Sequence, residues 1–211
     1  MKLAVLLFGI SKCEFEHISN NIYLIDYNNS YENYKKYIFD YFKNKGYDID
    51  VYFTTNMLDD KDKREICDKY NPVKCNFMEN EKDRIISRNT KINDVIDLCI
   101  ESGIAYDLIL ITRFDLLFQK DFDKSNIQLD KFNLVSLLEK PDFICDNFYL
   151  FPYKYLHIFS NICKNKLNHI FHCIKNDLHQ KIGMDSINYI LNENTYIRYL
   201  SFYKIVRIPF K

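Results

Sequence analysis

The chain has little glycine or proline, no tryptophan and no excess of charge of either sign. Its 211 residues include four Gly, four Pro and no Trp, and 29 Lys plus Arg balance 29 Asp plus Glu. So few turn-forming residues argue against collagen-like chains, linker-rich chains and β architectures with many tight turns. A net charge of zero argues against a general nucleic-acid-binding protein, so we expect no nucleic-acid partner.

Long apolar runs and several well-known motifs are also missing from the sequence. No stretch of about 18 apolar residues occurs, so we expect no integral membrane segment. The seven cysteines form no CxxC pair, which favours reduced thiols in a cytoplasmic protein. We expect no zinc site at His169, His172 and Cys173, because no fourth ligand follows at a suitable spacing. Neither a P-loop nor a GxGxxG, GxSxG or HExxH motif occurs, which disfavours the enzyme classes built on them.

What is present is an alternation of strand and helix patterns. Near-continuous apolar runs at Lys2–Gly9 and Tyr106–Thr112 predict strands buried on both faces. A helix is predicted over Ser30–Lys45, with Ser30 as N-cap, followed by a strand over Asp48–Thr54. Other patterns predict helices over 57–70, 81–102, 152–176 and 184–191, strands over 73–78, 132–138, 142–151 and 199–209, and a loop over 11–28 with a short element at 21–25. This order predicts one α/β domain with a mostly parallel sheet flanked by helices.

Two charged residues follow the strongest predicted strand. Arg113 and Asp115 are two positions apart, so both side chains leave the strand end on one side. Ligands of open α/β sheets bind at the carboxyl ends of the strands. There a carboxylate can hold a divalent metal ion, and an arginine can pair with phosphate oxygens. The alternative is an ion pair that only closes the strand end.

The segment Tyr106–Phe118 resembles a strand and Arg-x-Asp motif of GT-A-type glycosyltransferase-like proteins, which occur in bacterial polysaccharide loci and large viruses. Phe8-Gly9, Ile49–Thr55 and Cys145–Pro152 also fit that layout. The resemblance implies a single GT-A-like (Rossmann-like) domain over 1–211. Residues 1–118 would form its nucleotide-binding half and residues 119–211 its acceptor-side half.

The resemblance also implies roles for particular residues. Phe8 and Gly9 would contact the donor, and Asp115 would bind the donor diphosphate with Mn²⁺ or Mg²⁺. Arg113 stands where the usual DxD motif has its first acid, so it would take over part of the charge that a metal neutralises. Asp146 would contact the sugar or the acceptor, although an Asp146-Asn147 turn is an equal alternative. Asp185 would act as the catalytic base, with helix capping as its alternative.

Further donor-binding candidates come from the residues themselves. Arg84 and Arg88 are four apart, so they share one face near the start of a predicted helix and could approach the diphosphate. A solvated basic face is the alternative. Thr54, Thr55 and Asn56 end the second predicted strand and could contact the nucleoside, unless they only form a turn.

Together these patterns predict an enzyme, a glycosyltransferase that moves a sugar from a nucleotide-diphosphate donor to a hydroxyl of a glycan or another acceptor. If the protein is viral, we expect it in the host cytoplasm. A sugar nucleotidyltransferase is less favoured, because Gly9–Cys13 has only one glycine and one lysine where a Gly-rich basic loop is expected. A non-catalytic α/β binding or structural protein is the alternative from a different class.

Overall fold

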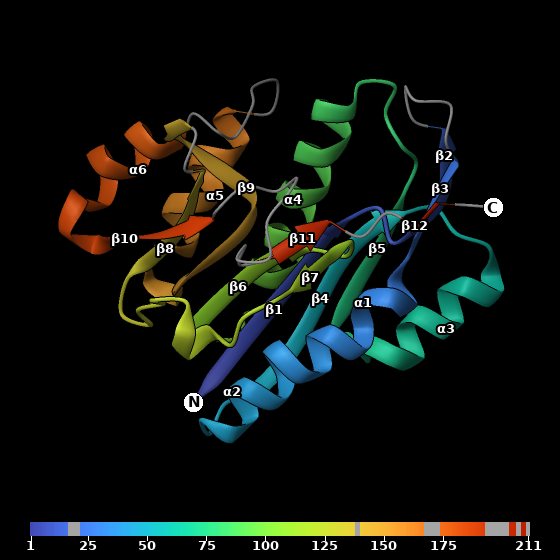
Figure 1. Ribbon diagram of the computed structural model, residues 1–211, viewed down its shortest axis with the longest axis horizontal. Helices are drawn as coiled ribbons and strands as arrows, with labels where there is room; N and C mark the ends of the chain where they lie inside the picture. Colours follow the sequence, from blue (N-terminus) through green and yellow to red (C-terminus); the bar gives the residue numbers. More distant parts are fainter. Residues whose placement is uncertain (17–21, 138–139, 167–173, 193–202, 206–207, 210–211) are drawn as a thin grey trace.

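A computed structural model describes residues 1–16, 22–137, 140–166, 174–192, 203–205 and 208–209. Its centre is a seven-stranded sheet in the order β10-β8-β9-β6-β1-β4-β5 (Figure 1). Only β9 runs antiparallel to its neighbours in this sheet. The strands are β1 (Lys2–Gly9), β4 (Asp48–Asn56), β5 (Lys74–Met78), β6 (Leu108–Arg113), β8 (Phe132–Leu137), β9 (Lys140–Pro152) and β10 (Ile187–Asn192). The predicted α/β class with a mostly parallel sheet is confirmed.

The burial of β1 on both faces explains why its apolar residues form a continuous run instead of alternating with polar ones. Leu3, Val5 and Leu7 pack into the core on one face of the sheet, whereas Ala4 and Leu6 pack into the core on the other. Successive strand side chains point to opposite faces, so a central strand must be apolar at every position when both faces are covered.

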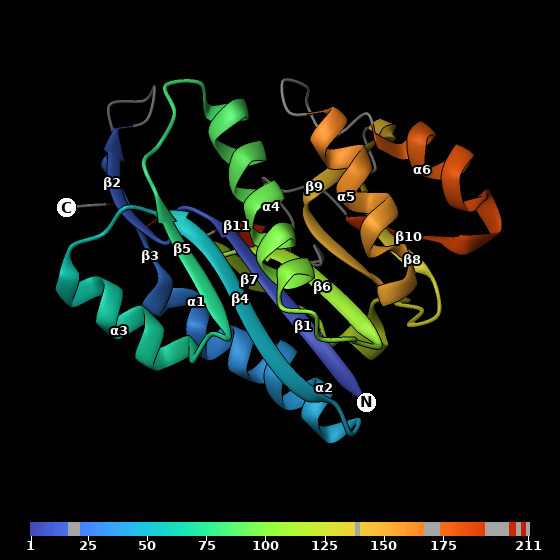
Figure 2. The ribbon, with the colours of Figure 1, turned by 180° about the vertical axis from the view of Figure 1, so that it is seen from behind.

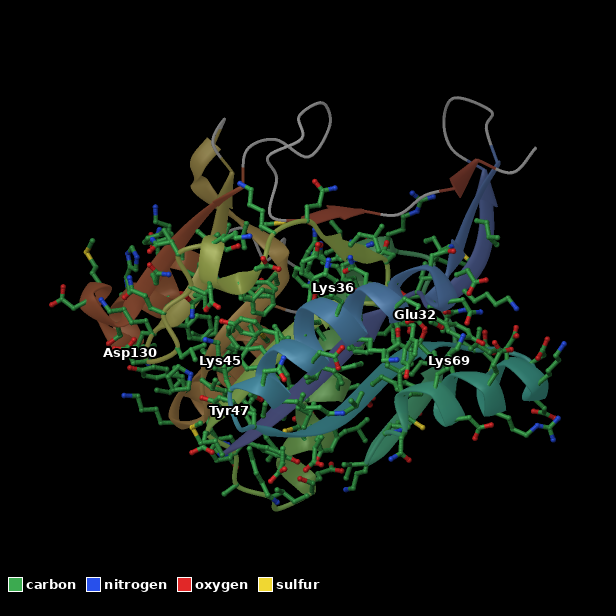
Figure 3. All side chains as sticks on the ribbon, turned by 60° about the horizontal axis from the view of Figure 1, so that its bottom comes forward. Glu32, Lys36, Lys45, Tyr47, Lys69 and Asp130 are labelled. Atoms are coloured by element: carbon green, nitrogen blue, oxygen red, sulfur yellow. The ribbon has the colours of Figure 1, made fainter. Side chains whose placement is uncertain are left out.

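Helices cover both faces of the sheet. One layer contains α1 (Tyr27–Tyr34), the π-helical η1 (Lys35–Asp40), α2 (Tyr41–Asn44) and α3 (Asp60–Tyr70). Figure 3 looks onto this layer, with Glu32 and Lys36 labelled on the continuous segment α1–η1 and Lys69 on α3. The opposite layer contains α4 (Arg84–Glu101), α5 (Leu156–Asn165) and α6 (Ile174–Ile182), which lie in front in Figure 2.

Two small sheets flank the central one. The segment predicted as a loop with one short element is instead a hairpin of β2 (Lys12–Glu16) and β3 (Ile22–Asp26), joined by β12 (Ile208–Pro209). β7 (Leu116–Phe118) pairs with β11 (Tyr203–Ile205). The predicted terminal strand is therefore divided between two sheets where it is described.

The first predicted helix begins three residues earlier than expected. The Asp26 carboxylate caps it by accepting from the Asn28 amide at 2.8 Å. Ser30 lies inside the helix, where its hydroxyl donates to the Phe114 carbonyl at 2.5 Å. The prediction of Ser30 as N-cap is therefore wrong. The helical segment ends before Gly46, whose φ of 82° suits a residue without a side chain.

The predicted helix over 184–191 is also wrong. A short 3₁₀ turn, Met184–Ser186, leads directly into strand β10. Ile187 and Ile190 are both buried, on opposite faces of the sheet. In a helix the same spacing of three would place them on one face. Pairing with β8 decides the outcome, since tertiary context overrides local preference in short segments. Among the described residues, no helix is long and apolar enough to cross a membrane.

Candidate functional site

A pocket of about 470 Å³ lies at the carboxyl edge of the parallel strands. Gly9 at the end of β1, Arg113 at the end of β6 and Arg84 at the start of α4 all line it. Six predicted site residues meet there: Phe8, Gly9, Arg84, Arg88, Arg113 and Asp115. The remaining wall comes from the segment after β1, the β2–β3 hairpin, the loop before α4 and α4 itself, through Ile10, Cys13, Ile25, Asn80, Glu81, Lys82, Ile85, Ser87 and Lys91.

Arg113 and Asp115 form a two-pronged ion pair at the edge of this pocket. Arg113 Nε donates to Asp115 Oδ1 at 2.7 Å, and Nη2 donates to Oδ2 at 2.5 Å. The Asp115 side chain is only 2% exposed, whereas that of Arg113 is 23% exposed. The third guanidinium nitrogen, Nη1, donates to Asn147 Oδ1 at 3.2 Å. The pairing considered from the sequence is therefore present, and it holds the guanidinium at the pocket wall.

The wall formed by α4 is basic. Arg84, Arg88 and Lys91 follow one another at spacings of four and three residues, so they share one face of the helix. Asp83 caps this helix by accepting from the Ile85 amide at 2.7 Å. Five basic and two acidic side chains line the pocket in all. Because Arg113 already neutralises Asp115, the pocket carries a surplus of positive charge and suits an anionic ligand.

Lys91 was not predicted as a site residue, although its spacing from Arg84 and Arg88 places it on the same face of the helix. It is only 2% exposed. Burial lowers the pKa of its ammonium group below the usual 10.5, and Glu81 offsets part of this effect. A buried cation in a pocket wall is a candidate for binding an anionic ligand.

Thr54, Thr55 and Asn56 do not line the pocket. All three are buried at the end of β4. Thr54 Oγ1 donates to Asp94 at 2.6 Å, and the Ser11 amide donates to Thr55 Oγ1 at 3.0 Å. Thr54 thereby joins β4 to α4, and Thr55 joins β4 to the segment after β1. Their predicted contact with the nucleoside stays a prediction.

The two predicted catalytic acids lie at opposite edges of the sheet. Asp146 belongs to β9, at a register shift beside the carboxyl end of β6, rather than in a turn. Asp185 precedes β10, which runs parallel to β8 and begins at the amino edge of the sheet. It is exposed there, inside the 3₁₀ turn whose N-cap is Gly183. The structure therefore does not bring Asp185 to the pocket.

The described residues do not fit a ready-made metal site. Both carboxylate oxygens of Asp115 accept from Arg113. No group of three His, Cys, Asp or Glu side chains within the described part of the chain is arranged to hold a metal ion. The predicted Mn²⁺ or Mg²⁺ at Asp115 stays a prediction. His169, His172 and Cys173, considered as zinc ligands, lie outside the described residues.

The chain is an α/β protein with a mostly parallel sheet and a basic pocket at its carboxyl edge. No protein-family model matches the sequence, and no curated protein matches it. A nucleoside-diphosphate-sugar pyrophosphorylase from Vibrio cholerae RC9 aligns with a TM-score of 0.53 and 14% identity, over 90% of this chain and 92% of that one. This likeness shows a shared fold.

Two glycosyltransferases align with lower scores. One, involved in glycosylation of the major capsid of PBCV-1, has a TM-score of 0.48 and 9% identity, over 97% of this chain and 92% of that one. The other, GlyE of Streptococcus pneumoniae TIGR4, has a TM-score of 0.41 and 11% identity, over 92% of this chain and 46% of that one.

Proposed function

We propose that the protein is a glycosyltransferase that binds a nucleotide-diphosphate sugar in the carboxyl-edge pocket and transfers the sugar to a hydroxyl of a glycan or another acceptor. The observation that carries this proposal is the meeting of the Arg113–Asp115 pair with the basic face of α4 in one pocket. Guanidinium and ammonium groups are the protein groups that best bind diphosphate oxygens.

In the reaction, those cations would stabilise the negative charge that develops on the leaving diphosphate. The acceptor hydroxyl gives its proton to a general base and its oxygen forms a bond to the anomeric carbon of the sugar, while the bond from that carbon to the diphosphate oxygen breaks. The nucleoside diphosphate leaves with the electron pair, so negative charge grows on its oxygens. Arg113, Arg84 and Arg88 line the pocket, where fixed positive charge stabilises that leaving group. Asp146 is our candidate for the acceptor side, because its backbone lies at this edge.

A sugar nucleotidyltransferase is the second candidate, because the V. cholerae pyrophosphorylase shares the fold. The segment after β1 disfavours it. That segment enters the β2–β3 hairpin directly, and Lys12 Nζ pairs with Asp62 Oδ1 at 2.7 Å. This hydrogen bond raises the pKa of Lys12 and uses its charge away from the pocket. A glycine-rich basic loop that could wrap a triphosphate does not follow β1.

The first experiment is thermal unfolding against a panel of nucleoside diphosphates and their sugars, each with EDTA or with Mn²⁺. A ligand at 100 times its dissociation constant adds about 2.7 kcal/mol to the free energy of unfolding. We expect one nucleotide class to raise the midpoint. Arg84→Met should reduce this shift, whereas Arg64→Met should not, because both arginines are exposed on helices and only Arg84 lines this pocket.

Turnover then separates the two enzyme classes. A glycosyltransferase releases nucleoside diphosphate from the nucleotide sugar when a hydroxyl acceptor is present. A nucleotidyltransferase instead makes nucleotide sugar and pyrophosphate from a nucleoside triphosphate and a sugar phosphate. No midpoint shift with any nucleotide would reject both enzymes and favour a non-catalytic protein.

A further inference from the structure

Lys91 is a buried cation that forms no ion pair among the described residues, although the nearby carboxylate of Glu81 favours its charged form. Its Nζ donates to Ser87 Oγ at 2.9 Å and to Asn80 Oδ1 at 3.0 Å. Both acceptors are neutral, and none of the ion pairs within the described ranges includes Lys91. Two ammonium protons are used in this way. An ammonium group has a third proton to donate.

Retaining this charge inside the protein has a cost. An ammonium group loses hydration when it is buried, and two neutral acceptors compensate only part of that loss. Lys91 is nevertheless held in the wall of a pocket of about 470 Å³. An anion in this pocket would complete its hydrogen bonds and compensate its charge. The desolvation cost has already been met during folding, so binding gains a charge-assisted hydrogen bond with little further penalty.

The surroundings favour a ligand with more than one charged oxygen. Arg113 projects from the end of β6 and Lys91 from α4, and both line the same pocket. Cations supplied from two different elements suit a ligand with several charged oxygens spread over two phosphorus atoms. The exposed Arg84 and the half-buried Arg88 add charge along the same helical face.

We propose that Lys91, oriented by Ser87 and Asn80, is the principal phosphate-binding residue of the pocket, and that with Arg113 it binds a diphosphate without a divalent cation. Naming the ligand as the diphosphate of a nucleotide sugar rests on the proposed function. The phosphate site itself does not, because inorganic pyrophosphate presents the same chemistry.

The test is calorimetric titration of the full chain with inorganic pyrophosphate in EDTA. We expect binding that Lys91→Met weakens about ten- to hundredfold, the value of a hydrogen bond to a charged group. Lys124→Met is the matched control, because Lys124 lies in the 3₁₀ turn Phe122–Lys124 and is 75% exposed. Asn80→Ala provides a second variant. Asn80 is exposed, so its loss leaves the core intact, and we expect a weaker decrease in affinity.

Three outcomes overturn the proposal: equal affinities of Lys91→Met and wild type, binding that appears only when Mn²⁺ is added, and no binding of pyrophosphate at all. Repeating the titration with the nucleoside diphosphates separates this proposal from the proposed function. Pyrophosphate binding that depends on Lys91, with no nucleotide-sugar binding or turnover, would retain the phosphate site and reject the glycosyltransferase. Nucleotide-sugar turnover that is unchanged in Lys91→Met would reject Lys91 as the principal phosphate-binding residue and retain the glycosyltransferase.

Discussion

The hydroxyl of Tyr34, on α1, donates a hydrogen bond to the main-chain carbonyl of Arg113. The same hydroxyl accepts from the Leu116 amide at 3.3 Å, so one side chain spans the whole Arg113–Asp115 turn. Tyr34 is fully buried, and burial raises the pKa of its phenol well above the usual 10. A neutral phenol can donate and accept at once, which is what this position requires.

Tyr34→Phe should lower the free energy of unfolding by about 1–3 kcal/mol, because it removes a fully buried hydroxyl that donates to the Arg113 carbonyl and accepts from the Leu116 amide. It should also weaken pyrophosphate binding, since the turn that carries Arg113 loses its tether. Urea unfolding and the same titration measure both effects. Tyr31→Phe is the control on the same helix: Tyr31 is half-buried and packs its ring against Tyr70, which phenylalanine retains. Equal stability of Tyr34→Phe and Tyr31→Phe would contradict this account.

Asp115→Asn should also destabilise the fold, whether or not the protein is an enzyme. It leaves Arg113 with a neutral partner in place of a two-pronged carboxylate. Breaking a buried pair costs about 3–5 kcal/mol, and the partial exposure of Arg113 reduces our expectation to about 2 kcal/mol. Asp123→Asn should have much less effect, because Asp123 pairs with Lys45 at the surface. Loss of stability at Asp115 therefore cannot separate a transferase from a binding protein, and only ligand titration can.

The central strands were predictable because burial on both faces of the sheet requires an apolar side chain at nearly every position. The apolar runs of β1 and β6 are short and continuous, which favours strands that are buried on both faces. The β10 segment was not predictable, because its strand character comes from pairing with β8, which has no local signal. The helix start at Tyr27 was missed for a related reason, since Asp26 and Ser30 are both good caps and the contact of Ser30 with Phe114 is remote in sequence.

The part of the candidate site that lies at the ends of strands was predictable. Arg113, Asp115 and Gly9 follow strands whose carboxyl ends must meet at one edge. Arg84 and Arg88 drew attention because arginine is rare here, whereas Lys91 is one of many lysines and its burial depends on the loop that carries Asn80. The position of Asp185 at the amino edge could not be predicted, because the segment after it was expected to be a helix and is a strand parallel to β8.

The free energy of unfolding should fall as the pH rises above about 8. Burial raises the pKa of Cys75 to about 12, with Cys67 adding to the effect, and burial with the nearby Asp50 does the same for Cys99. These thiols stay protonated in the folded chain, whereas they ionise near pH 8.5 when unfolded. The folded state then binds more protons than the unfolded state, so stability is fully present below about pH 8 and is lost as the pH rises toward 12.

Urea unfolding at pH 8, 9 and 10 checks this expectation. The buried thiol of Cys99 contributes a loss of about 1 kcal/mol per pH unit in this window, and the half-buried Cys75 contributes less because solvent screens it. Cys99→Val removes one titrating group while keeping an apolar side chain of similar size, so its stability should decline less steeply with pH than that of the wild type. A stability that is constant from pH 8 to pH 10 would rule out these pKa shifts.

Alanine substitutions at Gly9 and Gly46 distinguish the effect of backbone strain on stability from the effect of pocket shape on ligand affinity. Their φ angles are 101° and 82°, so an alanine at either position is strained and should cost about 1–2 kcal/mol of stability. A Cβ at Gly9 would lie 4.0 Å from Cγ of Arg113, whereas a Cβ at Gly46 would meet nothing within 4 Å. Only Gly9 lines the pocket. Gly9→Ala should therefore weaken pyrophosphate binding while Gly46→Ala leaves it unchanged, although both variants unfold earlier. If the two alanines affect affinity equally, the ligand does not bind against β1, and the pocket at the carboxyl edge is not the site.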